Sequence, residues 1–93
     1  MKNRLIALLL AAGTSFSAMA WPDKPITLVV PFPPGGSTDL IARTLSTKMA
    51  EKLGGDTTFI VDNRAGATGT IGAAQVSRAP ADGHTLLVTS LGP

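Results

Sequence analysis

The residues with the clearest chemical potential form a turn rich in glycine and hydroxyl groups, Gly35-Gly36-Ser37-Thr38. The turn follows an apolar run and precedes a helical pattern that starts near Asp39. A helix N-terminus presents unpaired backbone N–H groups and the positive end of the helix dipole, which favour a bound anion. Glycine lets a ligand approach the backbone closely, and Ser37 or Thr38 can cap the helix with its hydroxyl. We therefore expect a seat for a carboxylate or a phosphate.

Other site chemistries find less support in the sequence. No Walker loop G-x-x-x-x-G-K-[ST] occurs, and the glycines from Gly66 to Gly72 are spaced wrongly for a dinucleotide fingerprint. His84 is the only histidine, and we expect it in a solvent-exposed turn far from the anion seat. The chain has no cysteine, and one histidine with scattered carboxylates does not make a metal-ligand set. We expect no catalytic residues, no metal and no other cofactor.

Composition indicates one small folded unit without a nucleic-acid partner. The chain has 93 residues, of which 44% are hydrophobic and 15% are charged. The formal net charge is +2, but Lys2 and Arg4 lie ahead of the first apolar run. Without these two, the remaining six basic side chains match the six acidic ones. No basic patch with interleaved aromatic residues is left to bind nucleic acid.

The first twenty residues have the organisation of a secretory signal peptide. A basic start at residues 1–4 and an apolar stretch at residues 5–12 lead to Ala18-Met19-Ala20, an A-x-A cleavage pattern. The apolar stretch is shorter than the ~20 residues that a spanning helix needs, so we favour a cleaved signal over a membrane anchor. Cleavage near Ala20–Trp21 would release residues 21–93 into the periplasm, not embedded in the membrane.

Beyond residue 20 the pattern is strand, helix, strand, helix, strand. Residues 26–30 and 85–89 are apolar runs without alternation, which predict buried strands, and a further strand is predicted at residues 57–62. A shorter helix is expected over residues 70–78. Strands that alternate with helices imply an α/β fold with a parallel sheet and right-handed crossovers.

The longer helix is predicted over residues 39–53, before a glycine pair that would end it. Its apolar stripe recurs every four residues and has small residues beside it: Ile41, Leu45, Met49 and Leu53, with Ala42 and Ala50.

Three loops should meet at one edge, because parallel strands end on the same side of a sheet. They are the turn at residues 35–38, a second glycine-rich turn at residues 66–69, and the segment that begins at Ser90. Open α/β sheets bind ligands at this edge. We therefore expect one crevice that holds an anion.

Four strings, in this order, resemble the Bug receptor family, the substrate-binding proteins of tripartite tricarboxylate transporters. They are WPDKPI at residues 21–26, PFPPGGSTD at 31–39, VDNRAGATGTIGA at 61–73 and RAPADGHTLL at 78–87. The resemblance implies the type II periplasmic binding fold, with two α/β domains that close on a ligand. It also implies a non-enzymatic receptor that captures a tricarboxylate, dicarboxylate or related acid for membrane permease subunits.

The resemblance further implies which residues grip the ligand carboxylate, through backbone N–H groups, hydroxyls and ordered water. The matching positions lie in the three loops: Phe32, Gly36, Ser37, Thr38, Ala65, Gly66, Ala67, Gly69 and Ser90. Two roles stay open for Asp39, one in ligand binding and one at the start of the helix. Arg64 stays open between holding a carboxylate and bracing its own loop.

Family members are a few hundred residues long, whereas this chain ends at its third predicted strand. We therefore expect residues 21–93 to be the N-terminal part of the first domain of a truncated receptor, with weak or no binding alone. Two alternatives stay open: a fragment of a secreted α/β enzyme, such as a hydrolase or transferase, and a non-functional remnant of the receptor.

Overall fold

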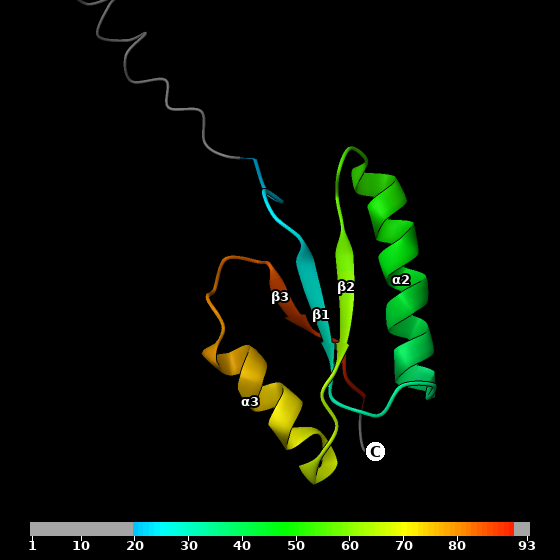
Figure 1. Ribbon diagram of the computed structural model, residues 1–93, viewed down its shortest axis with the longest axis vertical. Helices are drawn as coiled ribbons and strands as arrows, with labels where there is room; N and C mark the ends of the chain where they lie inside the picture. The colour runs from blue at the N-terminus through cyan, green and yellow to red at the C-terminus, as the bar shows by residue number, and fades with distance from the viewer. Residues whose placement is uncertain (1–19, 91–93) are drawn as a thin grey trace, which may run out of the picture.

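The computed structural model describes residues 20–90, which form a three-stranded sheet between two helices (Figure 1). In chain order the elements are β1 (Ile26–Val30), α2 (Ser37–Leu53), β2 (Phe59–Asn63), the 3-10 turn η1 (Ala67–Gly69), α3 (Thr70–Arg78) and β3 (Thr85–Leu87). The predicted signal segment, apart from Ala20, and residues 91–93 lie outside the described residues. Neither helix found between residues 20 and 90 has the length and apolar character needed to cross a bilayer.

The central strand is β1, which pairs in parallel with β2 on one side and β3 on the other. In this register Leu28 of β1 lies between Val61 of β2 and Leu86 of β3. Because β1 has a strand on each side and a helix over each face, Ile26, Leu28, Val29 and Val30 are at most 1% exposed. The apolar run that predicted a buried parallel strand is therefore the core of the molecule, and the predicted α/β class is confirmed.

The two helices cover opposite faces of the sheet. Asn63, at the end of β2, donates a hydrogen bond to Asp39 of α2 at 2.9 Å. Its neighbour Asp62 accepts one from Gln75 of α3 at 3.4 Å. Successive strand residues point to opposite faces, so α2 and α3 lie on different sides. All three strands run toward the same edge, at the bottom of Figure 1, where their following loops emerge.

The start of α2 differs from the prediction. The helix begins at Ser37, two residues earlier than expected, and its N-cap is Gly36 in an extended conformation. The cap has no side-chain hydrogen bond, so neither Ser37 nor Thr38 has the predicted capping role. Both residues lie inside the first turn, one and two positions after the N-cap, where their hydroxyls no longer cap the helix.

The apolar stripe of α2 is only partly buried. Ala42 is fully buried, whereas Ile41 is 53% exposed and Leu45 and Leu53 are also exposed. The face that meets the sheet is centred on Ala42, whose small side chain allows close approach, and it includes Thr38 and Asp39. The larger apolar residues therefore flank the contact face rather than fill it.

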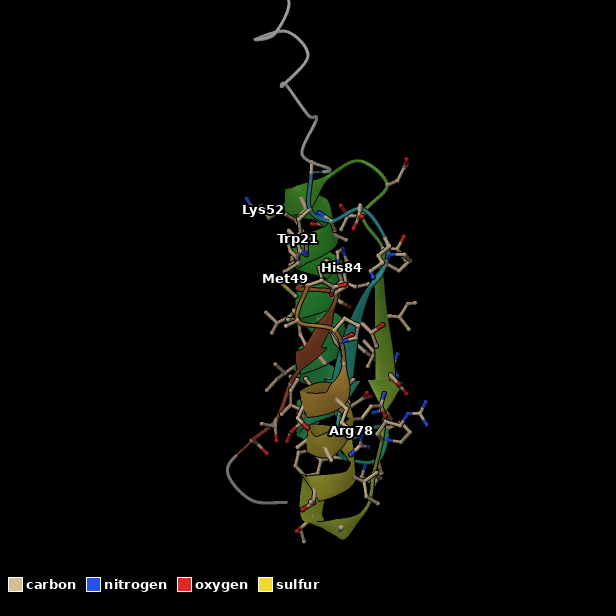
Figure 2. The ribbon with its side chains drawn as sticks, turned by 90° about the vertical axis from the view of Figure 1, so that its left-hand side faces the viewer. Trp21, Met49, Lys52, Arg78 and His84 are labelled. Carbon is tan, nitrogen blue, oxygen red and sulfur yellow. The ribbon has the colours of Figure 1, made fainter. Side chains whose placement is uncertain are left out.

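The surroundings of His84 correct a further prediction. His84 is only 7% exposed, although we expected a solvent-exposed turn. Its ring lies beside that of Trp21, with 6.1 Å between the centroids (Figure 2). Its Nε2 lies 3.0 Å from a carboxylate oxygen of Asp23, and its Nδ1 lies 3.3 Å from one of Asp82. The segment ahead of β1 folds back over the turn ahead of β3, and this covers the imidazole.

Candidate functional site

A hollow of about 330 Å³ lies at the carboxyl edge of the sheet. The turn after β1, the first turn of α2 and the segment after β3 line it: Phe32, Pro33, Pro34, Gly36, Ser37, Thr38, Asp39 and Ser90. The Thr38 hydroxyl donates to the Ser90 hydroxyl at 3.5 Å, across 52 positions of the chain. The parallel arrangement of β1 and β3 brings these two segments together.

The N-terminus of α2 presents unpaired backbone N–H groups beside this hollow. The first hydrogen bond of the helix runs from the Leu40 N–H to the Gly36 carbonyl oxygen, at 3.0 Å. The N–H groups of Ser37, Thr38 and Asp39 therefore precede the helical ladder. Together with the positive end of the helix dipole, they favour a carboxylate or another small anion.

The second glycine-rich loop lies behind Phe32 rather than in the hollow. Gly69 approaches the first loop closely, since a Cβ built on it would lie 3.7 Å from the Phe32 ring. Ala65, Gly66 and Ala67 are exposed but are not among the residues that line the hollow. The loop has an unusual backbone, because φ is positive at Ala67 and Thr68 as well as at Gly66 and Gly69.

The predicted site residues thus fall into two groups. The hollow brings together Phe32, Gly36, Ser37, Thr38 and Ser90. Gly69 adjoins this group through the Phe32 ring, while Ala65, Gly66 and Ala67 continue around the end of β2. The two loops are still neighbours, because the Arg64 N–H donates to the Val30 carbonyl oxygen at 2.8 Å.

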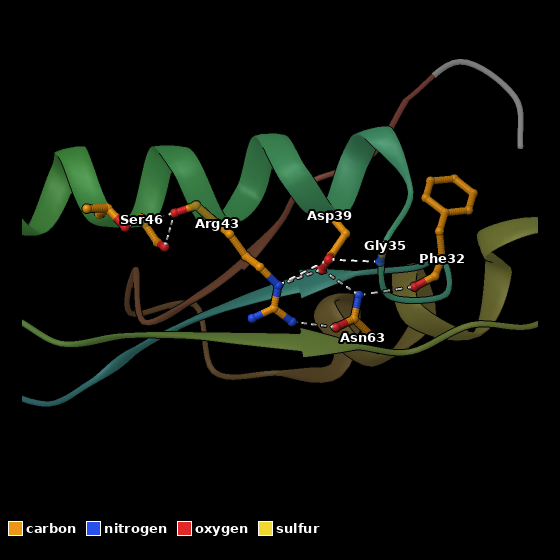
Figure 3. A network of polar contacts seen from close by, with 7 residues as sticks. Phe32, Gly35, Asp39, Arg43, Ser46 and Asn63 are labelled. Carbon is orange, nitrogen blue, oxygen red and sulfur yellow. Dashed lines mark hydrogen bonds and ion pairs between the residues drawn. The ribbon is translucent and has the colours of Figure 1, made fainter.

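Asp39 is the most constrained charged residue at the site (Figure 3). Its side chain accepts hydrogen bonds from Asn63 Nδ2 at 2.9 Å, from the Gly35 N–H at 3.0 Å and from Arg43 Nε at 3.1 and 3.2 Å. These donors, with the Asn63 amide as the largest cause, lower the pKa of Asp39 to about 2. Asp39 is therefore ionised at neutral pH, although only 5% of it is exposed.

Sequence reasoning left Asp39 undecided and missed the part played by Asn63 and Arg43. The i, i+4 spacing of Asp39 and Arg43 is the signal that could have suggested their pairing. The role of Asn63 depends on the alignment of β2 with β1, so no local pattern could reveal it. Arg64 pairs with Asp62, the residue two before it, at 3.0 Å, which favours the bracing role over a ligand role.

Metal binding has no support among residues 20–90, because no group of three His, Asp or Glu residues there could hold an ion. A second hollow, of about 530 Å³, lies near the amino edge of the sheet, between residues 20–25 and 53–57. It faces the C-terminal end of α2, so it lacks the amide groups that characterise the first hollow.

The comparisons with known proteins now identify the family. A family model described as "Tripartite tricarboxylate transporter family receptor" matches residues 41–92. The chain belongs to this family. It is 48% identical over 96 residues to the UPF0065 protein in the tcbD-tcbE intergenic region of Pseudomonas sp. strain P51, covering 98% of this chain and 28% of that protein. It is 49% identical over 74 residues to BugT of Bordetella pertussis, covering 80% and 22%.

Several solved structures share the fold of this chain over the aligned region. BugD aligns with a TM-score of 0.67 and 48% identity, over 72% of this chain and 22% of its own. R. palustris Rpa4515 with adipate aligns at 0.68 and 44%, over 73% and 22%. MatC from Rhodopseudomonas palustris with bound malate aligns at 0.67 and 43%, over 72% and 22%. The chain thus spans about a quarter of the length of these relatives. The predicted family and fold class are both confirmed, and one of the matched structures, BugD, is described as a periplasmic binding protein.

Proposed function

We propose that the chain is the N-terminal part of the first domain of a periplasmic receptor that captures a small organic carboxylate. The observation that carries this proposal is the hollow in which the first turn of α2 faces Ser90. Two structural neighbours, described with adipate and with malate, support the ligand class. Delivery to the permease subunits of a tripartite tricarboxylate-type transporter follows from the family description.

The ligand carboxylate would lie against the N-terminus of α2. The N–H groups of Ser37 and Thr38 donate to its oxygens, and the hydroxyls of Thr38 and Ser90 add polar contacts. Phe32 forms an apolar wall. We also assign ligand contacts to the second loop, direct or through water, at Ala65, Gly66, Ala67 and Gly69, which continue the same edge beyond Phe32.

The proposal includes export and processing. The signal segment would direct the chain to the periplasm and be removed near Ala20–Trp21. Residues 21–93 would then supply one side of the ligand site, and the remainder of a full-length receptor would supply the other. Affinity in this chain alone is expected to be weak for that reason.

Weak binding is best measured by NMR titration of the chain with malate, adipate and citrate. We expect backbone amide shifts at residues 36–38 and 90, with smaller ones at 65–69. The neutral diamide of malate is the matched control ligand, and it should leave these amides unchanged. Thr38→Ala should weaken the shifts, whereas Ser77→Ala, on the exposed side of α3, should not. Equal shifts with malate and its diamide would contradict carboxylate capture, and no shifts with any acid would favour the non-functional remnant.

A further inference from the structure

Asp39 presents a contradiction at a site for carboxylates. It lies among the residues that line the hollow and carries a negative charge of its own. A bare carboxylate there would repel the proposed ligand, because like charges at short range cost energy in a partly desolvated site. The contacts of Asp39 resolve the contradiction, since they point away from a ligand role.

The donors around Asp39 come from three different elements. The Gly35 N–H belongs to the turn after β1, Arg43 to the second turn of α2, and Asn63 to the end of β2. An acidic residue in the first turn of a helix often reaches back to the backbone N–H of the N-cap. Here Asp39 reaches one residue further, to Gly35, while the N-cap Gly36 has no side chain of its own.

Asn63 extends this network to the other end of the turn. While its Nδ2 donates to Asp39, it also donates to the Phe32 carbonyl oxygen at 3.3 Å. Its Oδ1 accepts from Arg43 Nη2 at 3.2 Å. Figure 3 shows the Phe32 carbonyl turned toward Asn63 and its ring turned away. The turn is therefore held at Phe32 and at Gly35, on either side of the two prolines.

We propose that Asp39, held by Asn63 and Arg43, is a positioning residue that fixes the turn at residues 32–36 and aims the first N–H groups of α2 into the hollow, without contacting the carboxylate. This inference rests on the proposed function for its ligand and on the hydrogen-bond network for its geometry. Arg43 offsets the charge of Asp39 locally, so the net charge beside the bound anion is small. Because the pKa of Asp39 is low, its carboxylate stays ionised and keeps its hydrogen bonds when an anion binds nearby.

The test compares amide hydrogen exchange in the chain and in the Asp39→Asn variant by NMR. We expect the Gly35 amide to exchange about tenfold faster or more in the variant, because a hydrogen bond to a charged acceptor is replaced by a weaker one. Asn63→Ala removes the same network from the β2 side and should accelerate the same amide. Asp82→Asn is the matched control, since Asp82 also has a lowered pKa but lies near the opposite edge. It should leave Gly35 unchanged.

A second amide separates positioning from a general loss of structure. The Val88 N–H donates to the Val29 carbonyl oxygen at 2.9 Å, outside the Asp39 network, and should exchange at its wild-type rate in both single variants. An unchanged Gly35 amide in both single variants, or a Val88 amide accelerated as much as that of Gly35, would overturn the positioning role.

Titration with malate as the probe gives the second readout. We expect Asp39→Asn and Asn63→Ala to weaken the malate-induced shifts at residues 36–38, in step with the faster exchange of Gly35. Weaker shifts with an unchanged Gly35 amide would show instead that Asp39 contacts the ligand. Faster Gly35 exchange in a chain that binds no acid would support the positioning of the turn and would favour the non-functional remnant over a working receptor.

Discussion

Gly72 of α3 lies directly against Pro31, the residue that follows β1. A Cβ built on Gly72 would lie 2.7 Å from the Cβ and 2.9 Å from the Cα of Pro31, distances that real side chains do not adopt. The same Cβ would also lie 3.1 Å from the Arg64 carbonyl oxygen. The absence of a side chain at this position therefore lets α3 approach the loops after β1 and β2.

Gly72→Ala should destabilise the fold by up to about 2 kcal/mol. Alanine favours a helix by about 1 kcal/mol over glycine, but the overpacking against the Pro31 backbone costs about 1–3 kcal/mol. Urea unfolding measures the net change. Ser77→Ala, on the exposed side of the same helix, is the control and should change stability by no more than about 0.5 kcal/mol. A more stable Gly72→Ala variant would show that the two loops are not packed this closely.

Stability should fall in acid between about pH 4 and pH 2. The pKa values of Asp39 and Asp82 are both lowered from 3.8 to about 2. A lowered pKa means that the folded state favours the ionised form, so the stabilisation is complete above pH 3.8 and is lost as the pH falls through 2. Urea unfolding at several pH values should show this loss.

The Asp82→Asn variant tests how much of this acid dependence comes from Asp82. The pKa of Asp82 is held down chiefly by Lys24, whose ammonium lies 2.9 Å away, and by the His84 N–H. The variant should be less stable at pH 6 and should lose less on acidification. Glu51→Gln, at an exposed pair with Lys48, should follow the wild-type curve, because exposed ion pairs contribute little. Identical acid curves for wild type and Asp82→Asn would contradict this assignment.

His84→Ala should weaken the attachment of residues 21–24 to the body of the fold. The imidazole is buried beside Trp21, whose indole N–H donates to the Gly83 carbonyl oxygen at 3.2 Å. Removing it leaves a cavity and takes a partner from Asp23 and Asp82, and we expect a loss of about 1–3 kcal/mol. Trp21 is the only tryptophan, so its fluorescence during urea unfolding reports on this segment directly. Lys24→Gln, at the exposed edge of the cluster, should have a smaller effect, and the reverse order would be evidence against a structural role for His84.

Two neighbouring residues can test which face of α2 packs against the sheet. Ala42 is fully buried against the sheet, whereas Ile41 is mostly exposed. Ala42→Gln should cost several kcal/mol by overpacking and by burying an amide, while Ile41→Gln should change stability by less than about 1 kcal/mol. Thermal unfolding monitored by circular dichroism distinguishes them. Equal losses would mean that Ile41 is covered in solution.

The elements that could be predicted from the sequence are those set by local patterns. The β-branched run that forms β1 and the bounds of α3 match the structure, because burial on both faces and helix periodicity leave clear signals in the residues themselves. The meeting of Thr38 with Ser90 also follows from local patterns, since parallel strands place their carboxyl ends at one edge. The bounds of β2 and β3 differ from prediction by only a few residues at their ends. The predicted burial of β3 is wrong, because β3 lies at the edge of the sheet and its Leu86 and Leu87 are 39% and 36% exposed.

The features that could not be predicted depend on contacts between distant residues. Trp21 meets Gly83 across 62 positions, and no periodicity links these two residues. The sequence predicts a hydroxyl cap for α2, because serine and threonine are good capping residues, whereas the N-cap in the structure is Gly36 with an extended backbone. Ala65, Gly66 and Ala67 lie at the predicted edge but outside the hollow, because a shared edge does not by itself decide which loops line the same hollow.

The hollow at the carboxyl edge contains no lysine or arginine among the eight residues that line it. The anion binding that we propose for it would depend on aligned amides, whose field falls off with distance faster than that of a full charge. A ligand should therefore not be steered from afar, and its rate of capture should hardly change with ionic strength. Recognition of this kind would act only at contact.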